Sequence, residues 1–205
     1  MKNKIIIIGA SGHGKVVADI AKLNSYKEIL FLDDDNSKKT NGKYTVAGTT
    51  KDIESYIEEY DFIVGIGNNS IRKRITNELL KLGITQTVLI HPSAVTDETV
   101  SIGKGTVVMA NAVINAESII GSSCIINTAT TIDHDCVIKD YVHVSPGVHI
   151  AGTVNVEEES WLGIGSTVIN NINIGRKCII GASGLVNKDI EEPGTYVGIP
   201  VRKVK

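Results

Sequence analysis

Apolar residues in the second half of the chain recur every six positions. From residue 90 to residue 186, the first place of each hexad is aliphatic in 16 of 17 cases, and the exception, Thr96, is β-branched. The residue four places later is Ala, Val, Thr, Ser, Cys, Gly or Ile throughout. A β-sandwich alternates with period two and turns about every 8 to 12 residues. An unbroken period of six therefore predicts a solenoid of stacked repeats.

Each hexad is expected to supply a strand of about two residues and a turn, so that three hexads close one triangular coil of about 18 residues. The aliphatic residue points inward and stacks on the residue one coil away, and the small residue fits near a corner. Cys124, Cys136 and Cys178 all fall on the small place, which predicts buried filler and no metal site. Three cysteines also favour a reduced, cytoplasmic protein over a disulfide framework.

Residues 1–88 follow a different pattern, in which apolar runs alternate with amphipathic segments. The stretch "KIIIIGASGHGKVVADIAKL" predicts a buried strand, a glycine-rich turn and a helix with Val16, Val17, Ile20 and Ala21 on its apolar face. "EILFLDDD" predicts a second strand that ends in acids, and "DFIVGIGNNSIRKRITNELLKLG" a strand, a turn and a helix. Alternating β and α segments favour a small Rossmann-like parallel sheet.

The glycine-rich turn is a candidate phosphate site. Its spacing is G-x-x-G-x-G, which differs from the dinucleotide pattern G-x-G-x-x-G. It nevertheless lies between a strand and a helix, where free backbone N–H groups and the helix dipole attract phosphate. Asp33 ends the next strand, near the offset at which an acid meets a ribose hydroxyl in nucleotide folds. The alternative is that the glycines only permit a tight turn and that the acids are a solvated loop.

Composition narrows the classes of partner. Apolar residues make up 42% and charged residues 21%, as in ordinary globular proteins, and aromatic residues only 4%. The net charge of −2 does not indicate a nucleic-acid surface, and no apolar run approaches the roughly 20 residues of a membrane span. We expect three segments: a nucleotide-binding domain at 1–88, a solenoid at 89–191, and a tail at 192–205 that Pro193 and Gly194 turn away from the solenoid.

The hexads resemble those of the hexapeptide-repeat acyltransferases. That resemblance implies a left-handed parallel β-helix, which has the form of a three-sided prism, and a homotrimer with acetyl-coenzyme A between the prisms of neighbouring subunits. Across the whole chain, "GASGHG", "LDD", "GIGNNSIRKRI", "HDC" and "GTYVGIPVRKV" occur in the order found in the nucleotide-sugar N-acetyltransferases of bacterial surface-glycan synthesis and the related sialic acid O-acetyltransferases. With these motifs taken together, the chain resembles an acetyltransferase with a nucleotide-sugar domain N-terminal to its β-helix.

This resemblance implies contacts for the substrate in the first domain. The glycine loop would contact the phosphates of a nucleotide sugar, and the acids after the second strand, with the turn near residue 67, would border the base and ribose. These residues are Ser11, Gly12, His13, Asp33, Asp34, Ile66 and Gly67.

In the solenoid, the resemblance makes His134 the general base. It is the third residue of its hexad, on the turn and outside the lumen, and imidazole titrates near the working pH. Asp135 would fix its tautomer and raise its basicity, although Asp is one methylene shorter than the Glu that the family also uses. The alternative is that Asp133, His134 and Asp135 form a solvated turn.

The coenzyme contacts implied by the resemblance are His143, Ile164 and Ala182, where the family commonly has Gly at the last position. Asn127 is a candidate contact to the sugar, and His149 has no matched role and is expected at the surface. His143 follows His134 by nine residues, half a coil, so the two should lie on different faces of one prism. They could share a site only across a subunit boundary.

The function expected from this resemblance is transfer of acetyl from acetyl-coenzyme A to the 4-amino group of a nucleotide-linked 4-amino-4,6-dideoxy sugar, with UDP as the expected nucleotide. Alternatives are a sialic-acid-type O-acetyltransferase, a GDP-perosamine N-acetyltransferase, and a trimeric scaffold without catalysis. No metal is expected.

Overall fold

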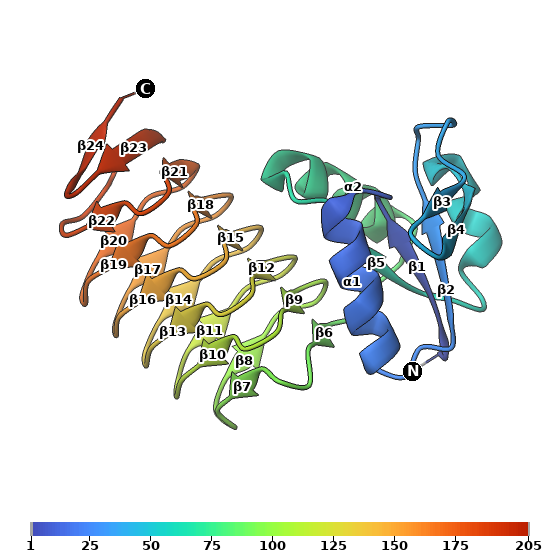
Figure 1. Cartoon of the computed structure of the whole chain (residues 1–205), viewed down its shortest axis with the longest axis horizontal. Helices are drawn as coiled ribbons and strands as arrows, with labels where there is room; N and C mark the ends of the chain where they lie inside the picture. Colours follow the sequence, from blue (N-terminus) through green and yellow to red (C-terminus); the bar gives the residue numbers. More distant parts are fainter. Residues whose placement is uncertain (1, 205) are drawn as a thin grey trace. The chain divides into compact units, whose positions relative to one another are not determined.

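The computed structural model describes residues 2–204, which form two compact units divided between Pro92 and Ser93. This division falls four residues after the predicted boundary. None of the described helices has the length and apolar character needed to cross a membrane. Figure 1 shows a parallel sheet with helices in the first unit and a run of stacked coils in the second.

The first unit is built on a five-stranded sheet in the order β3-β4-β2-β1-β5. Strands β1, β2, β4 and β5 pair in parallel, and only β3 is antiparallel to its neighbour. In chain order the elements are β1 (Lys4–Ile8), α1 (Gly12–Leu23), β2 (Glu28–Leu32), β3 (Thr40–Asn41), β4 (Tyr44–Gly48), the 3-10 helix η1 (Thr50–Tyr56), β5 (Asp61–Val64), α2 (Asn69–Lys81) and β6 (Leu89–Ile90). The strands and helices predicted from the first domain are confirmed, and the short β3–β4 hairpin and η1 are additions.

Alternation along β1 gives this sheet two apolar faces. Ile6 and Ile8 pack in a core with residues of α2 and η1, including Leu79 and Ile53. Because successive side chains of a strand point to opposite faces, Ile5 and Ile7 face the other way. Helix α1 contacts β1 and β2 through a buried stripe that contains Val17, Ala18, Ile20 and Ala21. Val16 was predicted on that stripe but is 40% exposed, since it precedes Val17 by one residue and so lies about 100° around the helix from it.

The second unit is a parallel β-helix with three faces, as predicted. The first face contains β7 (Val95–Thr96), β10 (Val113–Ile114), β13 (Thr131–Ile132), β16 (His149–Ile150), β19 (Thr167–Val168) and β22 (Leu185–Val186). The second contains β8 (Ser101–Ile102), β11 (Ile119–Ile120), β14 (Val137–Ile138), β17 (Asn155–Val156) and β20 (Asn173–Ile174). The third contains β9 (Val107–Val108), β12 (Ile125–Ile126), β15 (His143–Val144), β18 (Trp161–Leu162) and β21 (Cys178–Ile180).

Stacking follows the predicted period. Ile114 pairs with Ile132, and Ile126 with Val144, each one coil of 18 residues apart. Every first-place residue from Val108 to Val186 is no more than 2% exposed, and the three cysteines are fully buried and form no disulfide among the described residues. The fourth residue of each hexad from Gly105 to Ser183 has a positive φ, so every corner turns through one left-handed residue.

The C-terminal residues correct one prediction. The tail was expected to leave the solenoid, but β23 (Gly194–Gly198) pairs in parallel with β21, and β24 (Val201–Lys203) pairs back onto β23. Val201 is 4% exposed, and a side chain on Gly184 would meet it at 2.9 Å. The hairpin therefore covers the apolar end of the last coil, which would otherwise face water.

Candidate functional site

The predicted phosphate loop lies at the carboxyl end of β1, between β1 and α1. Ser11 occupies the N-cap of α1 but its side chain makes no capping hydrogen bond. The first N–H groups of a helix have no partner within the helix, so this end can accept an anion. Ser11 and Gly12 are exposed, and nothing lies within 4 Å of a side chain built on Gly12.

Two further glycines hold this loop close to the turn after β5. Gly9 has φ +108°, and a side chain there would meet Ile66 at 2.5 Å. A side chain on Gly14 would come within 2.2 Å of the Gly9 carbonyl oxygen. Strand β1 lies between β2 and β5, so the chain reverses its winding direction there. Ligands of open α/β sheets bind outside the carboxyl ends of the strands at such a point.

Arg72 fixes the turn after β5 through hydrogen bonds. This side chain is 1% exposed and donates hydrogen bonds to the carbonyl oxygens of Ile66 and Gly67 and to Asn69 Oδ1. Burial, together with the Arg72 charge, lowers the pKa of His13 to about 4. His13 is therefore a neutral imidazole, and its buried Nε2 has no hydrogen-bond partner among the described residues. If His13 contacts a phosphate, it does so as a neutral donor.

The acids after β2 are used inside their own unit. Asp33 accepts hydrogen bonds from Ala10 N–H at 2.7 Å and from Lys38 Nζ at 3.0 Å. Burial alone would raise the pKa of Asp33, but the hydrogen bonds and the Lys38 charge outweigh it and lower the pKa. Asp34 accepts from the Thr50 N–H and hydroxyl. Asp33 thus ties the glycine loop to β2, a role that the offset of an acid after a strand does not reveal.

In the β-helix, the predicted base lies at the corner between β13 and β14. His134 Nδ1 is 2.7 Å from Asp135 Oδ2, and both side chains are 58% exposed. Asp135 is the left-handed residue of its turn, with φ +58°, a conformation that Asp tolerates. The aspartate reaches the ring despite its shorter side chain. Because Nδ1 faces the carboxylate, it carries the proton of the neutral ring, and Nε2 is left as the base.

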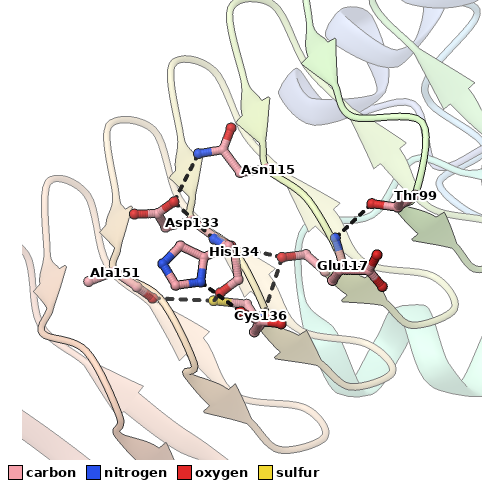
Figure 2. A network of polar contacts seen from close by, with 9 residues as sticks. Thr99, Asn115, Glu117, Asp133, His134, Cys136 and Ala151 are labelled. Carbon is pink, nitrogen blue, oxygen red and sulfur yellow. Dashed lines mark hydrogen bonds and ion pairs between the residues drawn. The ribbon is translucent and has the colours of Figure 1, made fainter.

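A second carboxylate completes this corner, as Figure 2 shows. Asp133 Oδ1 accepts hydrogen bonds from the His134 N–H and from Asn115 Nδ2, and these bonds lower its pKa. The pKa of His134 is raised, first by the hydrogen bond to Asp135 and then by the Asp133 charge. The arrangement gives an exposed imidazole whose basicity is raised by the two neighbouring carboxylates, Asp135 and Asp133.

The ring also depends on a glycine that the sequence does not single out. Gly152 lies one coil after His134, and a side chain there would be 2.6 Å from the ring atoms Cε1 and Nε2. Beside this corner a shallow cleft of about 310 Å³ is lined by Asn115, Thr131, Asp133 and His149, among others. His149, expected as a plain surface residue, contacts Thr131 Oγ1 at 2.9 Å in that cleft. Each pair is separated by 18 residues, one coil, a spacing that makes the two residues neighbours but is shared by every other outward pair of the β-helix.

The predicted coenzyme residues lie on and beside the third face. His143 begins β15, and Asn127 Nδ2 lies 3.3 Å from its Nε2, so Asn127 contacts a histidine. Ile164, which is 62% exposed, and Ala182, which is also exposed, occupy the same corner in successive coils. The Ser183 N–H bonds the Ile164 carbonyl oxygen at 2.8 Å, which stacks the two turns. Within one prism, His134 and His143 belong to different faces, as predicted.

Comparison with known proteins agrees with both units. Residues 4–79 match the PglD N-terminal domain family. The UDP-N-acetylbacillosamine N-acetyltransferase of Bacillus subtilis is 40% identical over 115 residues, which are 54% of this chain and 52% of that enzyme. The chain thus matches about half the length of this curated relative. The acetyltransferase domain of PglB from Neisseria gonorrhoeae, solved with acetyl coenzyme A, is 40% identical with a TM-score of 0.96 and full coverage of both chains.

The chain belongs to the hexapeptide-repeat family of nucleotide-sugar N-acetyltransferases. A second solved member of this family, PerB from Caulobacter crescentus in complex with CoA and GDP-perosamine, is 33% identical with a TM-score of 0.94. That match covers 98% of this chain and 97% of PerB. The fold class expected from the sequence and the family indicated by the motifs along the whole chain are therefore confirmed.

Proposed function

We propose that this protein transfers the acetyl group of acetyl-coenzyme A to the 4-amino group of a UDP-linked 4-amino-4,6-dideoxy sugar. The observation that carries the proposal is the exposed His134–Asp135 pair, in a chain that matches an acetyltransferase domain solved with acetyl coenzyme A over its whole length. UDP is preferred to GDP on local identity: the relative named for a UDP sugar is 40% identical over 54% of this chain, and the protein solved with GDP-perosamine is 33% identical over 98% of it.

The residues present fit the coenzyme. His143, Ile164 and Ala182 would hold it, since Ile164 and Ala182 give an exposed apolar corner that runs along two coils. Ala182, where the family commonly has Gly, lies at an exposed turn. When bound, acetyl-coenzyme A supplies an activated acyl group as a thioester.

The first unit would hold the nucleotide sugar. Its phosphates would lie at the N-terminus of α1, against Ser11, Gly12 and neutral His13, with the buried Arg72 charge behind the loop. The turn at Gly67 and the segment of Asp33 and Asp34 would border the base and ribose. Because both carboxylates already bond backbone N–H groups, they would shape this border more than bind the ribose directly.

His134 acts as the general base. Its Nε2 takes the proton that the sugar amine loses as the amine nitrogen bonds the acyl carbon. The carbon–sulfur bond then breaks, and the leaving thiolate of coenzyme A takes up the proton of the His134 imidazolium, which restores the base. Asp135 holds the Nδ1 proton and stabilises the imidazolium that forms. Since His134 and His143 lie on different faces of one prism, a complete site would need two subunits, as in the homotrimer that the resemblance to hexapeptide-repeat acyltransferases implies. The three cysteines, which form no disulfide among the described residues, favour the cytoplasm as its location.

Product analysis tests this function. The chain is incubated with acetyl-coenzyme A and an equimolar pool of UDP- and GDP-linked amino sugars, and the products are identified by mass spectrometry. We expect an acetylated UDP-linked 4-amino sugar that survives mild alkali, as an amide does. An alkali-labile ester would point to O-acetylation, and acetylated GDP-perosamine to the guanosine-linked alternative. A chain that produces nothing and shows no thermal shift with coenzyme A would be a scaffold.

A further inference from the structure

The single tryptophan of the chain lies beside a predicted coenzyme residue. Trp161 begins β18, and the pairing of β15 with β18 places it directly opposite His143. The two rings are stacked, with centroids 5.8 Å apart and planes 10° from parallel. Offset stacks of this kind are a favourable arrangement for aromatic pairs. The indole is 45% exposed, so it also presents apolar surface to a ligand on the third face.

Both rings are anchored by the same diagonal contact to the preceding coil. Trp161 Nε1 donates a 2.8 Å hydrogen bond to Ser145 Oγ, and the Ser145 side chain belongs to a residue that is 2% exposed. One coil earlier, His143 Nε2 meets Asn127 Nδ2 at 3.3 Å. In each pair the first strand residue reaches the residue that follows the previous strand of the face. The imidazole of His143 is thereby held at its edge by Asn127 and on its flat side by Trp161.

We propose that Trp161 is a positioning residue, which fixes the ring plane of His143 for acetyl-coenzyme A. This inference rests on the proposed function, because that function makes His143 a coenzyme contact. The exposed residue Ile164, which the proposed function also assigns to the coenzyme, follows Trp161 by three residues. A free His143 ring could rotate about its side-chain bonds, and the stack removes that freedom before the ligand arrives.

A double-mutant cycle on acetyl-coenzyme A affinity tests the role of Trp161. The proteins are the wild type, His143→Ala, Trp161→Leu and the double variant, measured by calorimetry. Trp161→Leu should weaken binding by about 3- to 10-fold, the range expected for loss of an aromatic pair. In the His143→Ala background the same change should cost less than about 2-fold, because the ring that Trp161 positions is gone. Equal losses in both backgrounds would overturn the positioning role.

Conservative variants sharpen the result. Trp161→Phe keeps an aromatic face and should restore most of the affinity that Trp161→Leu loses, whereas Ser145→Ala should lie between them. In steady-state kinetics, the weaker binding should appear as a higher KM for acetyl-coenzyme A, with kcat nearly unchanged. The matched control is Ile119→Ala, which removes an exposed apolar residue at the same hexad place on the second face and should leave affinity unchanged.

Two readouts separate this inference from the proposed function. The indole ring current should shift the His143 Cε1–H resonance in the absence of any ligand; the shift should vanish in Trp161→Leu and remain in Trp161→Phe. A wild-type chain that does not bind acetyl-coenzyme A would contradict the proposed function. A wild type that binds while Trp161→Leu binds equally well would contradict only the role of Trp161.

Discussion

In the first unit, Asp33 and Asp34 direct their carboxylates at backbone N–H groups of their own domain, whereas in the β-helix His134 and Asp135 bond each other and stay 58% exposed. In the first unit, the groups offered to a ligand are therefore backbone N–H groups at a helix N-terminus, and the acidic side chains hold that backbone in place. In the β-helix, the backbone groups of each coil hydrogen-bond to the neighbouring coils. The groups offered to a ligand are therefore side chains at the corners. Substitutions in the two units should therefore fail in different ways.

The largest effect is expected at the exposed corner. His134→Ala removes the base and should lower kcat by about 10²- to 10⁴-fold, with little change in the midpoint temperature of thermal unfolding, since the side chain is 58% exposed. Asn170→Ala is the matched control, because Asn170 is exposed at the same turn position two coils further along. Turnover of His134→Ala close to that of the control would remove His134 from the mechanism.

Gly152→Ala should approach the effect of removing the base while leaving the base in place. The new methyl group would lie 2.6 Å from the ring of His134, and the exposed ring can swing away from it. A displacement of about 1 Å can cost roughly 10²-fold in rate, so kcat should fall while the free energy of unfolding changes little. In His134→Ala, adding Gly152→Ala should cost nothing more. A further loss in that double variant would mean that Gly152 acts elsewhere.

Asp33→Ala tests the opposite behaviour of the first unit. Losing the bond to Ala10 N–H should lower the free energy of unfolding by about 1–3 kcal/mol, as hydrogen bonds to a charged group do. The folded pKa of Asp33 is lowered, so its contribution is present above the unfolded pKa of about 3.9 and disappears as the pH falls below it. Denaturation at pH 7 and at low pH should therefore show a gap that closes in acid. An unchanged stability at pH 7 would leave Asp33 free for a ligand.

Much of the fold follows from the hexads because a β-helix obeys one repeated rule. A residue that points inward in one coil points inward in the next, so a single phase predicts the burial of every first-place residue from Val108 to Val186. The strands of the first unit are equally legible, since "KIIII" and "DFIV" are buried on both faces. The hairpin β3–β4 was missed because its strands are short, carry no long apolar run and have only one buried residue, Asn41.

The site was predictable only in part. The type and spacing of His134 and Asp135 indicate a base beside a carboxylate, but their meeting depends on a left-handed corner that sets the direction of both side chains. The ring of His134 over Gly152, and the stack of His143 with Trp161, join residues 18 apart on the outside of the coil. Outward positions are free to vary in the hexad pattern, so periodicity does not distinguish these contacts from ordinary surface.

Asp135→Asn should have a smaller effect than either change at the ring, and a more specific one. Both side chains are exposed and solvated, so the loss in the maximal rate should be roughly tenfold, far below the ~10⁴-fold seen when a buried triad aspartate is changed to Asn. The pKa of His134 is raised chiefly by its hydrogen bond to Asp135, so it should fall toward the ordinary value of about 6.5 in the variant.

The rate–pH profile gives the sign of this effect. Imidazole is a base only when neutral, so the acid limb of the wild-type kcat/KM profile should lie above about pH 6.5. Asp135→Asn should move that limb to lower pH while the plateau falls, because the ring loses its proton more easily but is a weaker base. Asp133→Asn should move the limb in the same direction by less, since the Asp133 charge ranks second among the causes of the raised pKa. A limb that stays in place in Asp135→Asn would mean that the titrating group is not His134, and that the exposed corner of the β-helix only binds, as the glycine loop of the first unit is expected to do.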